Sequence, residues 1–143
     1  MKQEVALSNI EKIEALMFQY EDNQVHCPLK HTFSEGVYVR EITMPANTYI
    51  LGHEHTTTHL NIISKGSCVL ADMETGEMID IIAPYTFESK AGVQKLLYIV
   101  EECVWSTVHV TNETNITKLE EILIKPSKLC KQLRTKDKYI GGR

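Results

Sequence analysis

The sequence lacks several features that would place it in a special class of protein. Its 143 residues contain no apolar run near the roughly 20 residues that a membrane span needs. The first 18 residues carry acids and no small-residue cleavage site, so we expect no secretory signal and a cytoplasmic location. The four cysteines form no CxxC pair, which argues against a thiolate zinc site and favours free thiols.

Charge is unevenly distributed along the chain. The net charge is -4, yet residues 125–143 carry seven Lys and Arg residues against Asp137 alone. The remaining chain is therefore acidic, which does not favour nucleic-acid binding. We interpret the basic tail as a solvated, partly mobile terminus, although it could contact an anion.

Apolar periodicity separates two helical ends from a central β region. Residues 8–20 and 117–124 show helical spacing. Between them, short apolar segments alternate with turns, which predicts strands. These expected strands are 37–43, 49–51, 60–64, 67–72, 78–82, 86–89, 95–100 and 104–110.

Seven to nine short strands with regular turns are typical of an all-β barrel or sandwich, with the helices outside it. We expect one domain in three parts. Residues 1–30 form an N-terminal helical segment, residues 31–112 form the barrel, and residues 113–143 form a C-terminal helix and the basic tail.

Three of the six histidines, His53, His55 and His59, lie within seven residues. Residues two apart on a strand share a face, so His53 and His55 project together. Three threonines then turn the chain and bring His59 back beside them. Imidazole is a strong ligand for transition metals, so this spacing predicts a metal site. The alternative is a surface histidine cluster or polar loop.

The stretch from Met44 to Gly66 resembles the first motif of the cupin superfamily. That motif contains His-x-His, then a Glu, then a Gly six residues later. Here His53 and His55 match the pair, His59 stands where the Glu would be, and Gly66 closes the motif. The early Gly of the motif is missing. The resemblance implies a cupin-type double-stranded β-helix, or jelly-roll barrel, with a metal at its centre.

The second cupin motif is degenerate in this sequence. Ala91-Gly92 resembles its turn, but Lys95 stands where a ligand would be. His109, which shares a strand face with Trp105, is the preferred fourth metal ligand, and a hydrogen-bonded barrel histidine is the alternative. Residues 33–124 also resemble small cupin-like proteins encoded by phages and prophages. The matching pieces are 36–42, 59–66, 83–87 and 105–111.

Other polar or aromatic side chains on the expected strands could contact a ligand. Asn61 shares the face of His59, Arg40 could bind a carboxylate or phosphate in a bidentate contact, and Trp105 could wall a pocket. Each has a structural alternative: a strand-edge hydrogen bond for Asn61, a surface ion pair for Arg40, and core packing for Trp105. His26 and His31 are interpreted as ordinary loop residues, and Glu54 as a weak general base.

Three functions fit these patterns. The first is an enzyme that uses one divalent metal ion (Fe, Mn, Ni or Zn) for lyase, isomerase or dioxygenase chemistry on a small anionic molecule. The second is a non-catalytic module that binds a small molecule. The third is a phage structural or accessory protein with incidental histidines. We expect a homodimer and no nucleic-acid or membrane partner. A phage protein would work in the host cytoplasm.

Overall fold

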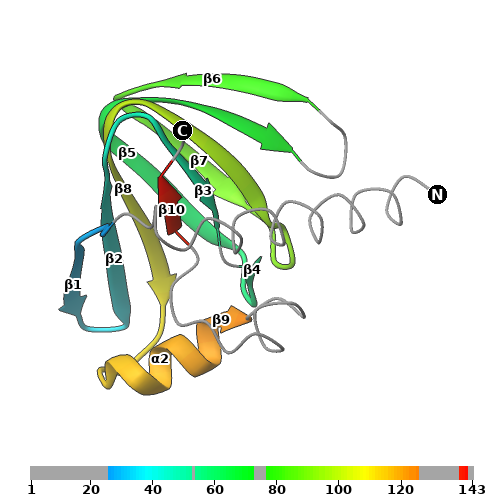
Figure 1. Cartoon of the computed structure of the whole chain (residues 1–143). Helices are drawn as coiled ribbons and strands as arrows, with labels where there is room; N and C mark the ends of the chain where they lie inside the picture. The colour runs from blue at the N-terminus through cyan, green and yellow to red at the C-terminus, as the bar shows by residue number, and fades with distance from the viewer. Residues whose placement is uncertain (1–25, 53, 73–76, 126–138, 142–143) are drawn as a thin grey trace.

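The computed structural model describes residues 26–52, 54–72, 77–125 and 139–141 (Figure 1). In chain order the elements are β1 Leu29–Ser34, β2 Val37–Met44, β3 Thr48–Leu51, β4 Glu54–His55, β5 His59–Asp72, β6 Met78–Ile82, β7 Tyr85–Ser89, β8 Lys95–Val110, α2 Ile116–Leu123, β9 Ile124–Lys125 and β10 Tyr139–Gly141. The helix expected over residues 8–20 lies outside the described residues. Among those described, no helix has the length and apolar character that crossing a bilayer requires.

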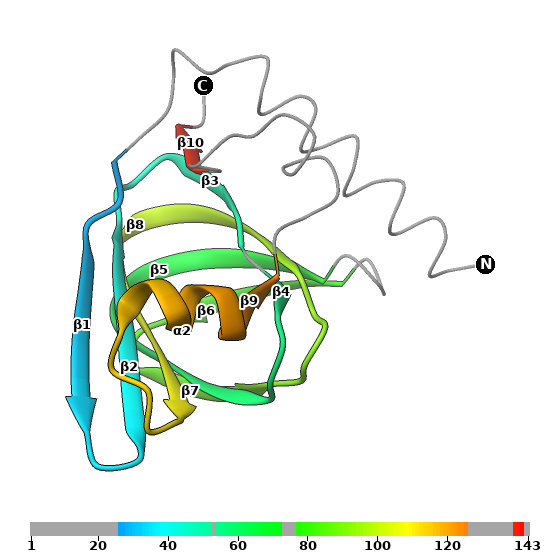
Figure 2. The same cartoon turned by 90° about the horizontal axis from the view of Figure 1, so that it is seen from below.

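The strands form an antiparallel sheet that curves into a barrel (Figures 1 and 2). The two long strands β5 and β8 pair with each other. β8 also pairs with β2 and β3, and β5 also pairs with β6 and β7. This arrangement confirms the predicted all-β, cupin-type architecture.

Strand alternation decides which side chains enter the barrel. Every second residue of β2 is buried, namely Tyr38, Arg40, Ile42 and Met44, while the residues between them are partly exposed. Ile42 and Met44 join inward residues of β5 and β8 in one apolar core that includes Ile63, Ile99 and Trp105. Burying a side chain of this size stabilises the fold by about 1.5–3 kcal/mol.

The sequence predicts turns at Lys65–Gly66 and at Glu101–Glu102, and both predictions are wrong. β5 and β8 run through these positions as single strands whose pairing register shifts there. Gly66 has a φ of +90°, and a Cβ at this position would collide with the carbonyl of Glu102. The glycine therefore creates a bulge that bends two paired strands, instead of ending one of them.

The C-terminal helix is confirmed at Ile116–Leu123 and closes one end of the barrel (Figure 2). The side chain of Asn115 caps it by accepting a hydrogen bond from the backbone N–H of Lys118 at 3.0 Å. Its buried residues Leu119 and Leu123 pack against Tyr38 of β2. Directly after the helix, β9 pairs with β4 and so fixes the position of His55.

Two further segments differ from the sequence-based expectations. β1, an antiparallel neighbour of β2, begins at Leu29, so His31 lies on a strand and not in a loop. In the basic tail, Tyr139–Gly141 pair with β3, so this part is not a free terminus. Neither strand has a strong apolar pattern of its own. Each forms by pairing, β1 with β2 across a turn and β10 with β3, which is distant in the sequence.

Candidate metal centre

Three histidines from three strands meet inside the barrel. His55 comes from β4, His59 opens β5, and His109 lies near the end of β8. Their ring centroids are 4.3 Å (His55–His59), 5.2 Å (His55–His109) and 5.0 Å (His59–His109) apart. One nitrogen of each ring lies within 4.8 Å of the others, so the three could hold a metal ion.

The backbone around His55 is held by hydrogen bonds to segments distant in the sequence. Its carbonyl accepts from the N–H of Gly92 at 2.9 Å. The next residue, Thr56, donates its N–H to the carbonyl of Leu123 and its hydroxyl to the carbonyl of Ile122, at 2.9 and 2.7 Å. The end of α2 therefore supports the loop that carries this histidine.

His59 has a defined proton position. Its Nδ1 lies 2.9 Å from the carbonyl oxygen of Thr57. A carbonyl can only accept, so Nδ1 carries the hydrogen and donates it, and Nε2 keeps a lone pair. A backbone carbonyl in this role is a common support for metal-binding histidine.

Burial favours the neutral form of His59 and His109, which is the form that metal binding requires. His109 is 2% exposed and His59 is 6% exposed. Burial, followed by the charges of His59 and Arg40, lowers the pKa of His109 to about 4. Burial also lowers the pKa of His59, with a smaller opposing effect from its hydrogen bond to Thr57.

The residues present fit a metal ion. Nδ1 of His109 is fully buried and has no hydrogen-bond partner among the described residues. A buried polar atom of this kind calls for a ligand or ion, because leaving it unpaired costs free energy. Together, three neutral imidazoles match the donor set of Zn, Fe, Ni and similar ions.

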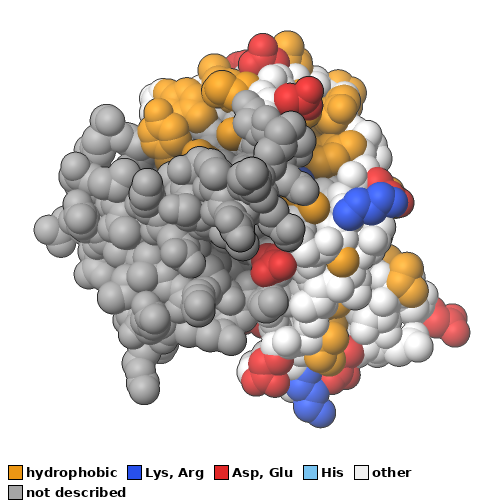
Figure 3. All heavy atoms as spheres, turned by 90° about the vertical axis from the view of Figure 1, so that its right-hand side faces the viewer, with side chains coloured by type: hydrophobic (Ala, Val, Ile, Leu, Met, Phe, Trp, Pro, Cys, Tyr) orange, Lys and Arg blue, Asp and Glu red, His pale blue; other side chains and the backbone are white. Residues whose placement is uncertain are grey.

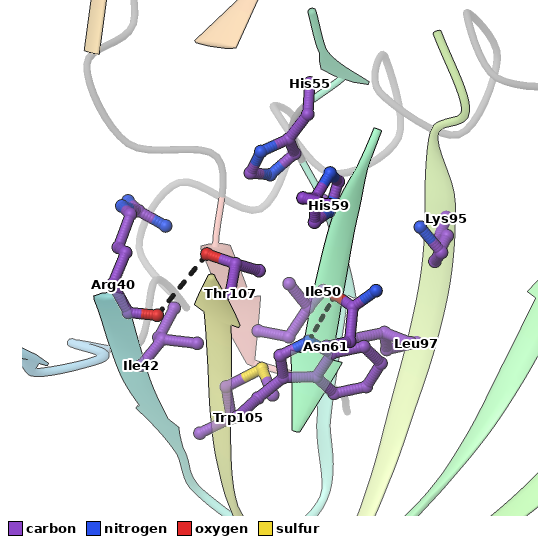
Figure 4. Close-up of a pocket in the computed structure, with 12 residues that line it drawn as sticks. Arg40, Ile42, Ile50, His55, His59, Asn61, Lys95, Leu97, Trp105 and Thr107 are labelled. Carbon is purple, nitrogen blue, oxygen red and sulfur yellow. Dashed lines mark hydrogen bonds between the residues drawn. The ribbon is translucent and has the colours of Figure 1, made fainter. Parts of the chain in front are cut away.

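A pocket opens beside the histidines and has about 70 Å³ of room (Figure 4). Its floor is apolar, and Arg40 and Lys95 lie on opposite sides of His55 and His59. No carboxylate is among the described residues that line it. The lining residues are Arg40, Ile42, Met44, Ile50, Gly52, His55, His59, Asn61, Lys95, Leu97, Trp105 and Thr107.

A hydrogen-bonded chain fixes the indole of Trp105 in the pocket wall (Figure 4). Its Nε1–H donates to Oδ1 of Asn61 at 2.9 Å, and Nδ2 of Asn61 donates to the hydroxyl of Ser89 at 2.7 Å. All three residues are buried. Asn61 therefore holds Trp105 in place while lining the pocket itself.

The structure brings together most of the residues that the sequence singled out. His55, His59 and His109 converge, and Arg40, Asn61 and Trp105 all line the adjacent pocket. His53 lies outside the described residues. Lys95 lines the pocket but is not part of the histidine cluster.

The structure corrects one expectation about a side chain and adds residues that were not assigned to the site. Arg40 does not form the surface ion pair considered as its alternative, because it is buried and no carboxylate pairs with it among the described residues. Sequence reasoning also missed Ser89, and it placed Thr107 on the face of His109 without assigning it to the pocket. Thr107 follows from strand alternation with Trp105 and His109, but no local pattern links Ser89 to Asn61.

No family model matches the sequence, and no curated protein matches it significantly. Among solved structures, the chain is similar to an RmlC-like cupin family protein with a double-stranded β-helix fold from Methanocaldococcus jannaschii. The TM-score is 0.50 at 15% identity, covering 61% of this chain and 82% of that one. A cupin superfamily protein from Desulfitobacterium hafniense gives 0.51 at 12% identity, covering 66% and 86%.

A protein from Neisseria meningitidis gives a TM-score of 0.51 at 8% identity, covering 59% of this chain and 84% of that one. At these identities the likeness shows the fold alone. The fold is the cupin double-stranded β-helix, as the resemblance to the cupin motif implies. Within it lies a histidine cluster, His55, His59 and His109, that could hold a metal ion.

Proposed function

We propose that this protein binds one divalent transition metal ion, Fe, Mn, Ni or Zn, through His55, His59 and His109. The observation that carries the proposal is the convergence of three buried imidazoles, with ligand nitrogens within 4.8 Å, at the head of a pocket. His53, which was predicted as a ligand together with these three, lies outside the described residues and stays a prediction from the sequence.

We further propose that the pocket binds a small anionic molecule next to the metal. Neutral imidazole ligands leave the ion's full positive charge in place. The cationic side chains of Arg40 and Lys95 line the same pocket, and no carboxylate does so among the described residues. The electrostatic field therefore favours an anion over a cation or neutral molecule.

As a metal-dependent enzyme, the protein would fit lyase, isomerase or dioxygenase chemistry. When bound, the metal would supply Lewis-acid activation of the molecule beside it. The chain's own residues would orient the bound molecule and exclude water from it. Arg40 would pair with its charged end and the apolar floor would contact the rest, while Asn61 fixes Trp105 in the pocket. Glu54, half-buried, does not line the pocket.

The absence of a carboxylate base among the described pocket residues favours a second candidate, a non-catalytic binding module. The two functions differ in what happens to a bound molecule. Metal-loaded protein would be incubated with a panel of small carboxylates, and the mixture analysed by mass spectrometry. Chemical change of the bound molecule supports the enzyme, whereas recovery unchanged supports the binding module.

The metal itself is tested first. Protein purified without a histidine tag would be analysed for metal content, alongside the variant His55→Ala and the control His26→Ala, whose histidine is exposed. We expect metal in the wild type and the control and strong depletion in His55→Ala. Absence of metal from all three would overturn the proposal and favour a structural or accessory role.

We also propose a homodimer. β6 pairs only with β5 among the described strands, and its Met78 and Ile82 are each 73% exposed. Hydrophobic side chains gather along the upper edge of the face in Figure 3, where β6 lies in Figure 1. An open strand edge with apolar side chains is suited to pairing with a second copy. Light scattering should show that the wild type is a dimer and that Ile82→Lys is a monomer. A monomeric wild type would refute the homodimer.

The cytoplasmic location, the phage origin and the division of the chain near residues 30 and 112 stay predictions from the sequence.

A further inference from the structure

Arg40 is a buried cation with no counter-charge among the described residues. Its residue is 9% exposed, and its Nε is fully buried with no hydrogen-bond partner among the described residues. Its backbone carbonyl accepts from the hydroxyl of Thr107 at 3.4 Å, but this contact does not touch the guanidinium. None of the ion pairs in the described part of the chain includes it.

This burial is costly unless something pairs with the charge. A guanidinium carries its positive charge in proteins, so the cost of burying it is offset only by a partner for that charge. Buried charges are almost always paired, and the pocket beside Arg40 offers no carboxylate among its described lining residues. A metal on the histidines would add further positive charge. Among the described residues nothing supplies the counter-charge, and Arg40 lines the pocket, so an anion bound there would supply it.

The rest of the pocket limits what that anion can be. Below the histidines and Arg40 lies an apolar floor formed by Ile42, Ile50, Leu97 and the indole of Trp105 (Figure 4). A ligand that fills the pocket therefore needs an apolar part as well as a charged end. One water-sized group needs about 10–15 Å³, so the 70 Å³ pocket suits a molecule of only a few non-hydrogen atoms.

We propose that Arg40 is the specificity-determining residue for a short-chain aliphatic carboxylate. Its planar guanidinium pairs with the planar carboxylate through two parallel hydrogen bonds, and the alkyl tail lies on the apolar floor. Inorganic phosphate could pair with the guanidinium but would leave the floor unfilled. This inference deepens the proposed function, because it names the class of molecule that binds beside the metal.

Trp105 provides a direct readout, because it is the only tryptophan in the chain and lines the pocket. Its fluorescence would be followed while butyrate, butyramide or inorganic phosphate is titrated into the full chain, once metal-free and once loaded with Zn²⁺. We expect butyrate to bind at least tenfold more tightly than butyramide or phosphate in both forms. Equal binding of butyrate and butyramide, or tighter binding of phosphate, would overturn the inference.

Two variants separate the charge of Arg40 from its shape. Arg40→Met removes the charge and keeps the length, and should weaken butyrate binding at least tenfold while leaving Zn²⁺ stoichiometry unchanged. Arg40→Lys keeps the charge without the planar pair of donors and should bind butyrate with intermediate affinity. Lys65→Met, which changes an exposed lysine paired with Glu102, is the control and should bind like the wild type.

Protein stability provides a measurement that a folding defect cannot imitate. Replacing an unpaired buried charge with an apolar side chain of similar size should raise the melting temperature of the ligand-free protein, so Arg40→Met should melt higher than the wild type. A stable Arg40→Met protein that binds butyrate as well as the wild type refutes the carboxylate role. If the wild type does not bind Zn²⁺ but binds butyrate in a way that depends on Arg40, only the metal proposal is refuted.

Discussion

The ring of His59 is anchored to the backbone two residues before it, since its Nδ1–H donates to the carbonyl oxygen of Thr57 at 2.9 Å. The bond selects one tautomer and one orientation of the imidazole. It leaves Nε2 as the nitrogen with a free lone pair. The bend at Thr56–Thr58 thus orients a ring nitrogen that could bind a metal ion.

This contact predicts a tautomer that NMR can detect. In metal-free protein near neutral pH, long-range proton–nitrogen correlation spectra should show His59 protonated at Nδ1. Addition of Zn²⁺ should shift the Nε2 resonance most strongly, because that atom binds the ion. A His59 ring protonated at Nε2 in the metal-free protein would contradict the geometry.

The stability of metal-free protein should fall as the pH drops from about 6.5 to about 4. Burial lowers the pKa of His109 to about 4, against about 6.5 in an unfolded chain. Between these two pH values the unfolded chain binds more protons than the folded one, so the free energy of unfolding rises with pH. The contribution of His109 is fully present above about pH 6.5. The lowered pKa of His59 acts in the same direction.

Urea unfolding at several pH values measures this effect, and His109→Gln is the variant to compare. The variant should show a shallower loss of stability between pH 6.5 and 4. His26→Gln, which changes an exposed histidine outside the cluster, is the control variant. Identical slopes for wild type and His109→Gln would show that His109 is not held neutral.

Much of the barrel could be predicted because strand alternation is a local property. The inward positions Tyr38 and Arg40, His59 and Asn61, and Trp105 and His109 follow from it directly. Whether a strand continues through a glycine depends on its pairing with a distant strand, so it cannot be predicted from the local sequence. The sequence predicts a turn at Gly66, whereas β5 continues through Gly66 as a bulged strand paired with β8.

Gly66→Ala should destabilise the protein by about 3 kcal/mol, from a strained positive φ and a collision with the carbonyl of Glu102. Gly36→Ala is the matched control, because Gly36 also has a positive φ, +75°, but the nearest atom to an added Cβ is 3.8 Å away. The control should cost about 1 kcal/mol. If urea unfolding shows the same loss in free energy of unfolding for both variants, the close contact between Gly66 and Glu102 does not affect stability.

The candidate site could be predicted only in part, for a related reason. The spacing of His55 and His59 and the facing of His109 are visible in the sequence. The support of these residues is not, because Leu123 holds the backbone beside His55 and Ser89 holds Asn61 from positions far along the chain. Such partners are defined by the closed barrel and have no motif of their own.

Asn61→Leu should destabilise the protein by about 2 kcal/mol, because the buried indole N–H of Trp105 and the hydroxyl of Ser89 lose their partner. The fluorescence of Trp105 should also change, since its environment loses a hydrogen bond. Asn112→Leu, at an exposed position, should change stability by less than about 0.5 kcal/mol. If unfolding and fluorescence are unchanged in Asn61→Leu, Asn61 does not position Trp105.

The central claim is that His55, His59 and His109 hold one metal ion. Calorimetric titration of Zn²⁺ into metal-free, untagged protein tests it most directly, with His59→Ala and His109→Ala compared against the exposed control His26→Ala. We predict one ion per chain for the wild type and the control, and at least tenfold weaker binding for both cluster variants. No saturable binding, or equal affinity in all four proteins, would contradict the account.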